Sequence, residues 1–182
     1  MQDVAEDISE VSFQDLDLPQ WLTDRLAEVG YESPTPVQAA AIPAVRSGVD
    51  VVAQAQTGTG KTAAFAIPLL AEIDPSNGPV QALILTPTRE LAQQVSDEFA
   101  TLGEQSELRA FSVYGGVSMD PQVEAFKRAH VIVGTPGRLL DHLRRGTLKL
   151  KNLRVFGLDE ADEMLSMGFE REISEILSLL PD

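Results

Sequence analysis

The most informative segment of the sequence is Ala55-Gln56-Thr57-Gly58-Thr59-Gly60-Lys61-Thr62. It lies between an apolar, strand-like run at 50–53 and an apolar, helix-like run that begins near Ala63. The two glycines allow positive φ, so successive backbone N–H groups can point at one anion at the start of the following helix. The stretch therefore predicts a phosphate-binding loop between a strand and a helix.

Lys61 and Thr62 complete the loop pattern G-x-x-x-x-G-K-[ST]. The charge of Lys61 can reach the β- and γ-phosphates, and the hydroxyl of Thr62 can ligate a Mg²⁺ that bridges them. Ala55 stands where the pattern has its first glycine, and a small residue fits there. The alternative is a glycine-rich turn that only links strand to helix. Gly-Lys-Thr in this context is more demanding than a glycine pair, which favours the phosphate loop.

A second acidic site follows the strand-like run 155–158, where the chain reads Asp159-Glu160-Ala161-Asp162. Ligands of an open parallel sheet gather outside the carboxyl ends of its strands, so Asp159 can lie beside the phosphate loop. We predict that Asp159 holds Mg²⁺ through its water shell and that Glu160 orients or deprotonates the attacking water. Alternatively, the acids form a solvated helix start, where carboxylates favour the helix dipole. The phosphate loop favours the metal site.

The chain resembles the DEAD-box ATP-dependent RNA helicases over residues 13–182. The letters at 159–162 are those that name the family, and the family's own phosphate loop begins with Ala. Further matches occur in the family's order: Gly30-Tyr31-Glu32-Ser33-Pro34-Thr35-Pro36-Val37-Gln38 with Phe13 upstream, Pro87-Thr88-Arg89-Glu90-Leu91, Gly115-Gly116 and Thr135-Pro136-Gly137-Arg138.

The resemblance implies an adenine site around Gln38, Tyr31 and Phe13. The amide of Gln38 carries a donor and an acceptor and can address the N6 and N7 edge of adenine, which would select ATP over GTP. Tyr31 offers a face on which the base can stack, with Phe13 packed behind it. Without the resemblance, core packing of the two rings and a surface helix position for Gln38 are the simpler interpretations.

The resemblance also implies three RNA-contacting segments. Thr135 is suited to cap a helix that has Pro136 at its first position, and such a helix start binds anions, here an RNA phosphate. Taken alone, this is a plain helix cap, Arg89 is a surface charge or an ion-pair partner, and Gly115-Gly116 is a turn. The implied RNA-contacting residues are Pro87, Thr88, Arg89, Gly115, Gly116, Thr135, Pro136, Gly137 and Arg138.

The loop and the resemblance together define the nucleotide site. The expected cofactors are ATP and Mg²⁺. Its expected binding residues are Phe13, Tyr31, Gln38, Gln56, Thr57, Gly58, Thr59, Gly60, Lys61, Thr62 and Asp162. Lys61, Asp159 and Glu160 are the expected catalytic residues, and Thr62 and Asp159 are the expected metal ligands.

Composition is acidic, with 28 Asp and Glu against 14 Lys and Arg, a net charge of −14 and a pI near 4.4. A nucleic-acid binder is usually basic, but one positive face can coexist with an acidic remainder. The acidity serves solubility or reflects a salt-adapted source. The chain has no cysteine, which excludes disulfides and thiol chemistry, and we expect neither a signal peptide nor a membrane span.

The apolar pattern predicts strands alternating with helices. Strands are expected near 49–54, 80–86, 109–114, 130–134 and 153–159, and helices over 19–29 and 35–47 and after 60, 88, 118, 136 and 170. This pattern is typical of an α/β fold with a parallel sheet covered by helices on both faces. By resemblance the fold is a RecA-like P-loop NTPase domain.

We expect residues 1–11 to be a disordered acidic tail and residues 12–182 to be the first RecA-like domain of a helicase. The family's second RecA-like domain, which carries arginine fingers, is not in this sequence. The function implied is ATP-dependent unwinding of short RNA duplexes by a cytoplasmic protein, with RNA and the second domain as partners, no membrane contact and a monomeric fragment. An ATP-gated RNA clamp stays open as an alternative. A general phosphate-loop ATPase is disfavoured by the segments around Gln38 and Arg138.

Overall fold

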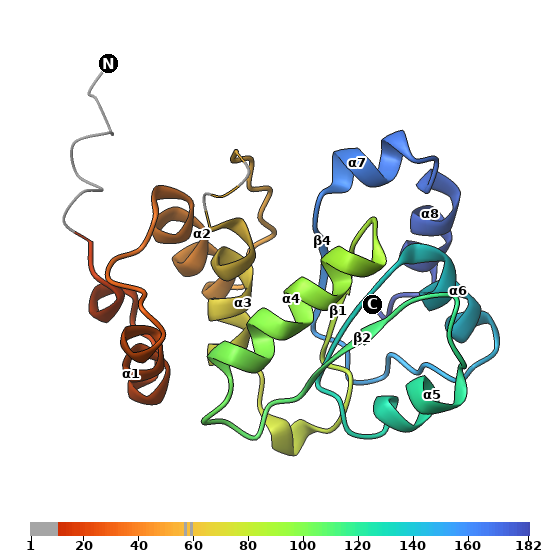
Figure 1. The fold of residues 1–182 in the computed structure, drawn as a ribbon, viewed down its shortest axis with the longest axis horizontal. Coiled ribbons are helices and arrows are strands. Elements are labelled where there is room, and N and C mark those ends of the chain that lie inside the picture. Colours follow the sequence, from red (N-terminus) through yellow and green to blue (C-terminus); the bar gives the residue numbers. More distant parts are fainter. Residues whose placement is uncertain (1–10, 57, 59) are drawn as a thin grey trace. The chain divides into compact units, whose positions relative to one another are not determined.

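The computed structural model describes residues 11–56, 58 and 60–182, so residues 1–10 of the tail expected at 1–11 lie outside the described residues (Figure 1). The chain forms two compact units, which are described separately. The first unit comprises the residues up to Glu72 together with Thr101–Ser106, and the second comprises Ile73–Ala100 and Glu107–Asp182.

The first unit is helical. A 3₁₀ turn, η1 (Phe13–Leu16), is followed by α1 (Gln20–Glu28), α2 (Pro36–Arg46) and α3 (Lys61–Glu72). The helices expected over 19–29 and 35–47 are confirmed within one or two residues. Helix α2 begins where the sequence indicates, because the Thr35 hydroxyl accepts a hydrogen bond from the backbone N–H of Gln38 and Pro36 occupies the first turn. Leu22, Leu26, Ile42 and Ile67 are fully buried between these helices.

The strand expected at 49–54 is not formed. Residues 51–56 have no regular secondary structure, and Val52 is 99% exposed. Three valines, at 49, 51 and 52, give this segment the apolar character of a strand, but a strand requires a neighbour to receive its backbone hydrogen bonds. In the described part of the chain this segment has no such neighbour in the sheet. The prediction was therefore wrong for this element.

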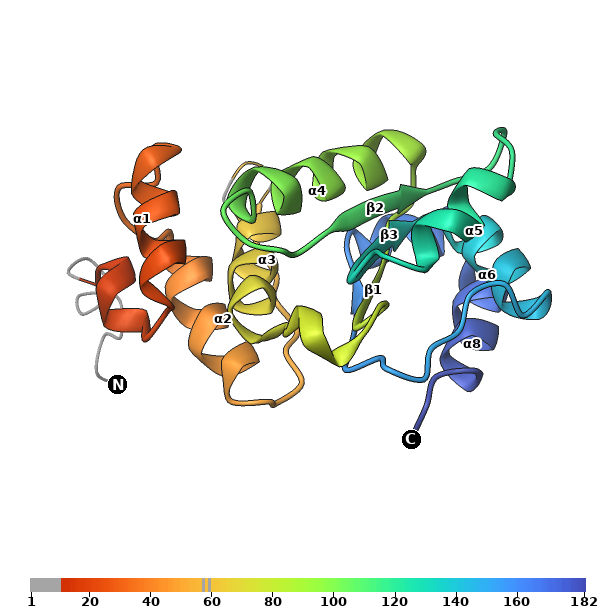
Figure 2. The same ribbon diagram turned by 90° about the horizontal axis from the view of Figure 1, so that it is seen from below.

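The second unit contains a parallel sheet of four strands in the order β2-β3-β1-β4 (Figures 1 and 2). The strands are β1 (Ala82–Leu85), β2 (Ala110–Val113), β3 (Val131–Gly134) and β4 (Val155–Leu158). Each pairing is parallel, with Ile84 opposite Val133 and Gly157, and Ser112 opposite Val133. Four of the five predicted strands and their parallel direction are thus confirmed.

Helices cover both faces of this sheet. Leu83, Leu85 and Ile132 pack in one cluster with Leu139 of α6 (Pro136–Arg144) and Ile176 of α8 (Glu170–Ser178). The same cluster includes residues of α5 (Asp120–Phe126) and of α7 (Ala161–Ser166), a short helix that the sequence did not predict.

The opposite face of the sheet carries α4 (Arg89–Leu102) (Figure 2). Side chains alternate along a strand, so Ile84 and Val133 face away from the first cluster. Ser112, in register with Val133, donates its hydroxyl hydrogen to Gln93 Oε1 of α4 at 3.0 Å. An α/β fold with helices on both faces of a parallel sheet is therefore confirmed.

Strand β4 forms one edge of the sheet. Among the described residues it pairs with β1 alone, and Leu158 at its end is 41% exposed, whereas β1 and β3 are buried throughout. The outer backbone groups of β4 therefore have no strand partner in the described part of the chain.

His130, just before β3, makes the second unit sensitive to acid. Its Nδ1 accepts a hydrogen bond from the backbone N–H of Arg109 at 3.0 Å. Burial first, and then the charge of Arg109, lower the pKa of His130 below its ordinary 6.5, against the opposing effect of Glu107. The unfolded chain therefore takes up a proton before the folded chain does, and this histidine reduces stability as pH falls through 6.5.

We expect the free energy of unfolding of the native protein to fall between about pH 7.5 and about pH 5.5 more steeply than that of His130→Gln, whose amide oxygen can accept the same hydrogen bond. Urea unfolding at the two pH values measures the difference. Parallel pH dependences of the two proteins would contradict the assignment.

Candidate functional site

The predicted phosphate loop lies at the start of α3 in the first unit. Gly58 and Gly60 both have φ of +81°, and Lys61 is the first residue of the helix. The first turn is closed by the N–H of Ala64, which donates to the oxygen of Gly60 at 3.1 Å. The loop thus has the glycine geometry and the helix start that bind an anion. Thr57 and Thr59, two of the predicted nucleotide residues, lie outside the described residues.

Gln38 links α2 to this loop. Its Oε1 accepts from the backbone N–H of Thr35 at 3.0 Å, and its Nε2 donates to the oxygen of Gly60 at 3.2 Å. The side chain is 1% exposed, so it is a buried residue rather than a surface one. Gly60 has a positive φ, which favours glycine, and a Cβ there would also meet the side-chain amide of Gln38.

Phe13 and Tyr31 form an edge-to-face pair in the first unit. Their ring centroids are 6.2 Å apart and the ring planes are inclined by 77°. Phe13 is buried and Tyr31 is partly exposed. The contact expected between the two rings is present, and Tyr31 is the member that keeps surface open to a ligand.

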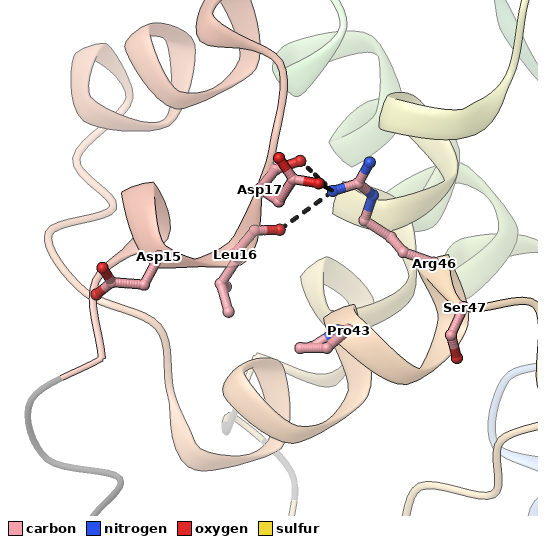
Figure 3. A pocket seen from close by; sticks show the side chains of 6 residues that line it. All are labelled: Asp15, Leu16, Asp17, Pro43, Arg46 and Ser47. Carbon is pink, nitrogen blue, oxygen red and sulfur yellow. Dashed lines mark hydrogen bonds and ion pairs between the residues drawn. The ribbon is translucent and has the colours of Figure 1, made fainter.

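A shallow cavity of ≈ 320 Å³ in the first unit is not this nucleotide site (Figure 3). It is lined by Asp15, Leu16, Asp17, Pro43, Arg46 and Ser47. Arg46 donates to the backbone oxygens of Leu16 and Asp17, and its Nε bonds Glu72 at 2.8 Å. This arginine therefore ties η1 to α2 and α3, and its charge is already compensated by acidic neighbours.

The acidic motif lies at the end of β4 in the second unit. Asp159 is buried, and its backbone N–H donates to the oxygen of Leu85 at 2.9 Å, which continues the sheet by one residue. Glu160 precedes α7 as its N-cap and has φ 56° and ψ 50°, the left-handed region. Asp162 is exposed in the first turn of α7. No group of three or more metal-binding side chains occurs in the described part of the chain.

The three segments expected to contact RNA follow β1, β2 and β3. Because the strands are parallel and adjacent, their carboxyl ends share one edge of the sheet, so Pro87–Arg89, Gly115-Gly116 and Thr135–Arg138 come together there. The Thr88 hydroxyl accepts from the N–H of Leu91 and caps α4. Thr135 is the N-cap position and Pro136 the first residue of α6, as the sequence predicts, but the Thr135 side chain makes no capping hydrogen bond.

Side chains between these segments connect them. The guanidinium of Arg89 lies 5.1 Å from the ring centre of Tyr114, in cation–π contact. Arg138 Nη1 donates to the oxygen of Val117 at 2.9 Å and to Gln122 Oε1 at 3.1 Å. Tyr114 and Gln122 were not singled out in the sequence. The only signal that marked them was proximity to Gly115-Gly116.

Together, the fold and the glycine-rich helix start define an α/β protein of the phosphate-loop nucleotide-binding class. The family model described as DEAD/DEAH box helicase matches residues 35–182. The chain therefore belongs to the DEAD/DEAH box helicase family, and its fold is the RecA-like α/β domain of DEAD-box proteins.

Two curated relatives illustrate the similarity. The chain is 49% identical over 172 residues to the DEAD-box ATP-dependent RNA helicase CshA of Bacillus licheniformis, covering 94% of this chain and 35% of that protein. It is 51% identical over 176 residues to the ATP-dependent RNA helicase DeaD of Mycobacterium tuberculosis, covering 96% of this chain and 31% of that protein. The chain thus spans about a third of the length of these relatives.

A solved structure is similar over most of this chain. The crystal structure of a DEAD box protein from the hyperthermophile Methanococcus jannaschii superimposes with a TM-score of 0.91 at 47% identity, covering 93% of this chain and 47% of that one. Within the described residues, none of the helices has the length and apolar character needed to cross a membrane.

Proposed function

We propose that this chain is the ATP-binding domain of an RNA-dependent ATPase that unwinds short RNA duplexes when it is joined to a second RecA-like domain. The observation that carries the proposal is the gathering of three segments at the carboxyl ends of β1, β2 and β3, next to the end of β4, where Asp159 stands. Ligands of open parallel sheets bind at such an edge.

The first unit supplies the nucleotide-binding residues. Backbone N–H groups at the start of α3 and the ammonium of Lys61 hold the phosphates, with Gln56 and Gly58 in the same loop. The two hydrogen bonds of Gln38 use one N–H and one oxygen lone pair of its amide. The second N–H and the second lone pair can address the adenine edge. Tyr31 stacks on the base and Phe13 supports it.

The hydroxyl of Thr62 in the first unit and the carboxylate of Asp159 in the second are each hard oxygen donors of the kind that Mg²⁺ prefers, and we propose each as a ligand of the ion. When bound, Mg²⁺ neutralises charge that develops on the phosphoryl oxygens. Glu160 orients the attacking water and accepts its proton, and Asp162 is the second residue of α7, two positions further on.

RNA phosphates are held at the edge of the second unit. Helix α6 presents its N-terminus with Thr135, Pro136 and Gly137, and Arg138 and Arg89 add positive charge. Gly115 and Gly116 are exposed and permit close approach of a strand. These contacts address the backbone, so recognition is expected to be independent of sequence. We place the protein in the cytoplasm and expect the chain itself to be a monomer.

Steady-state ATP hydrolysis, with and without single-stranded RNA, tests this function. Arginine fingers account for roughly 10³–10⁵ in rate in related phosphoryl transfer, so RNA-stimulated turnover should be near background for this chain and should appear when a second RecA-like domain is joined to it. Equal RNA-stimulated rates for the two proteins would contradict the two-domain proposal. ATP-dependent retention on RNA without strand separation would favour a clamp instead of a helicase.

Replacing Gln38 by glutamate should reduce the preference for ADP over GDP by about 1–3 kcal/mol, because the carboxylate lacks the N–H that the adenine edge requires. The variant also loses the hydrogen bond to Gly60, which weakens the binding of ADP and GDP equally. The ratio of the two affinities, measured by calorimetry, therefore separates base recognition from support of the loop. An unchanged ratio in the variant, or equal affinities in the native chain, would exclude the adenine role of Gln38.

A further inference from the structure

Gln122 of α5 stands at the centre of a buried polar network in the second unit. It is 4% exposed, and its side chain makes three hydrogen bonds. Its Oε1 receives Arg138 Nη1 at 3.1 Å and pairs with His142 Nε2 at 2.7 Å, while its Nε2 donates to the oxygen of Tyr114 at 3.0 Å. One amide thus touches the segment before Gly115-Gly116 and two side chains of α6.

The partners fix the orientation of this amide. A guanidinium only donates and a carbonyl oxygen only accepts, so Oε1 must face Arg138 and the amide nitrogen must face Tyr114. His142 Nε2 therefore carries a hydrogen and donates to Oε1. His142 is fully buried, its Nδ1 lies 2.8 Å from Thr147 Oγ1, and the ring of Phe126 packs against it at 4.8 Å. Burial, and then the charge of Arg138, lower the pKa of His142.

The network reaches all three segments at the sheet edge. The backbone oxygen of Tyr114 accepts a hydrogen bond from the amide of Gln122, and its ring is in cation–π contact with Arg89. Arg138, which is only partly exposed, is held by Gln122 and by the oxygen of Val117, and its Nη2 would lie 4.0 Å from a Cβ at Gly115. Its guanidinium is thereby kept beside the exposed glycines.

We propose that Gln122 is a positioning residue for RNA, which holds Arg138 beside Gly115-Gly116 and so keeps the three RNA-contacting segments preformed as one surface. The inference rests on the proposed function. An arginine that is already ordered loses less rotamer freedom when it meets a phosphate, so pre-ordering raises affinity without any contact between Gln122 and RNA. A purely structural network would instead hold α5 against α6 and leave RNA affinity unchanged.

Affinity for a fluorescent single-stranded oligouridylate at low salt provides the test. Gln122→Met keeps the volume of the side chain and removes all three hydrogen bonds. We expect it to weaken binding by about tenfold, the size of one lost hydrogen bond to a charged group. The matched control is Gln81→Met. Gln81 is also a buried glutamine of the second unit, but it precedes β1 and donates to the backbone oxygens of Asp74 and Gly78. The RNA affinity of Gln81→Met should therefore equal that of the native chain.

A double-mutant cycle identifies the route of the effect. If Gln122 acts through Arg138, then Gln122→Met adds nothing to Arg138→Ala, and the double variant binds as Arg138→Ala does. NMR of the Nε–Hε group of Arg138, recorded without RNA, should show an ordered side chain in the native protein and a mobile one in Gln122→Met.

Three results would count against these conclusions, and they are distinguishable. Native affinity in Gln122→Met, while Arg138→Ala is weakened, overturns the positioning inference and leaves the proposed function standing. Additive losses in the cycle also overturn it, since the two residues then act separately. Absence of RNA binding by the native chain overturns the proposed function and the inference with it.

Discussion

Replacing Lys61 by alanine is expected to weaken binding of ATP or ADP with Mg²⁺ by roughly a hundredfold or more, because a charge-assisted contact to the phosphates is lost while the anion stays. Lys61 is the first residue of α3, so its ammonium adds to the backbone N–H groups of the helix start. In the variant these N–H groups must bind the phosphates alone. Calorimetric titration of the chain with ADP measures the loss. Lys127→Ala is the matched control, because it removes an equal charge from an exposed pair with Glu124 outside the loop.

Glu160→Gln gives the contrasting result for the same site. The amide cannot accept a proton from water, so hydrolysis should slow while nucleotide affinity stays at the native value. Hydrolysis is to be measured in a protein that joins this chain to a second RecA-like domain. Loss of ATP binding in Glu160→Gln, or native affinity in Lys61→Ala, would show that the roles of the two residues are misassigned.

Gly134→Ala is expected to reduce the free energy of unfolding by about 2–3 kcal/mol, within the range for overpacked cores. Gly134 ends β3, and a Cβ built there would lie 2.5 Å from the backbone oxygen of Val113 and 2.9 Å from Leu139 Cγ. The same oxygen of Val113 receives the N–H of Thr135 at 3.1 Å. The added methyl group must therefore move β2, or the start of α6, or both.

Gly137→Ala is the control for this variant. Nothing lies within 4 Å of a Cβ at Gly137, which is in the first turn of α6 and lacks positive φ, so alanine should leave stability unchanged or raise it slightly. Urea unfolding curves of the two variants and the native chain decide the matter. Equal stabilities for Gly134→Ala and Gly137→Ala would contradict the prediction, because the backbone at the end of β3 and its neighbours would then accommodate the methyl group with little loss of stability.

Four strands could be predicted because each is a short and mainly apolar run, and two of them, Ala82–Leu85 and Val131–Gly134, are buried throughout. The segment 49–54 has the same local character, yet a strand is a property of a pair, and the sequence of one member does not show its partner. Helix α7 was missed for the opposite reason. It has six residues and is acidic at its start, so periodicity gives little signal.

The candidate site divides along similar lines. Gly60, Lys61 and Pro136 are marked in the sequence, because helix starts that bind anions need particular residues at particular places. Gln122 and His142 carry no such mark. Their roles come from contacts 16 to 20 residues away in the chain, which only the packing of α5 against α6 creates. The bond from Gln38 to Gly60 spans 22 residues and was hidden in the same way.

The left-handed backbone of Glu160 has a consequence for the evolution and engineering of this chain. A residue with a side chain pays about 1 kcal/mol or more in that conformation, whereas glycine adopts it freely. Selection for thermal stability alone would therefore favour glycine at position 160, and selection for hydrolysis, as proposed, favours the carboxylate. A search for stabilising substitutions guided by melting temperature would single out this position and remove the residue that we propose to serve turnover.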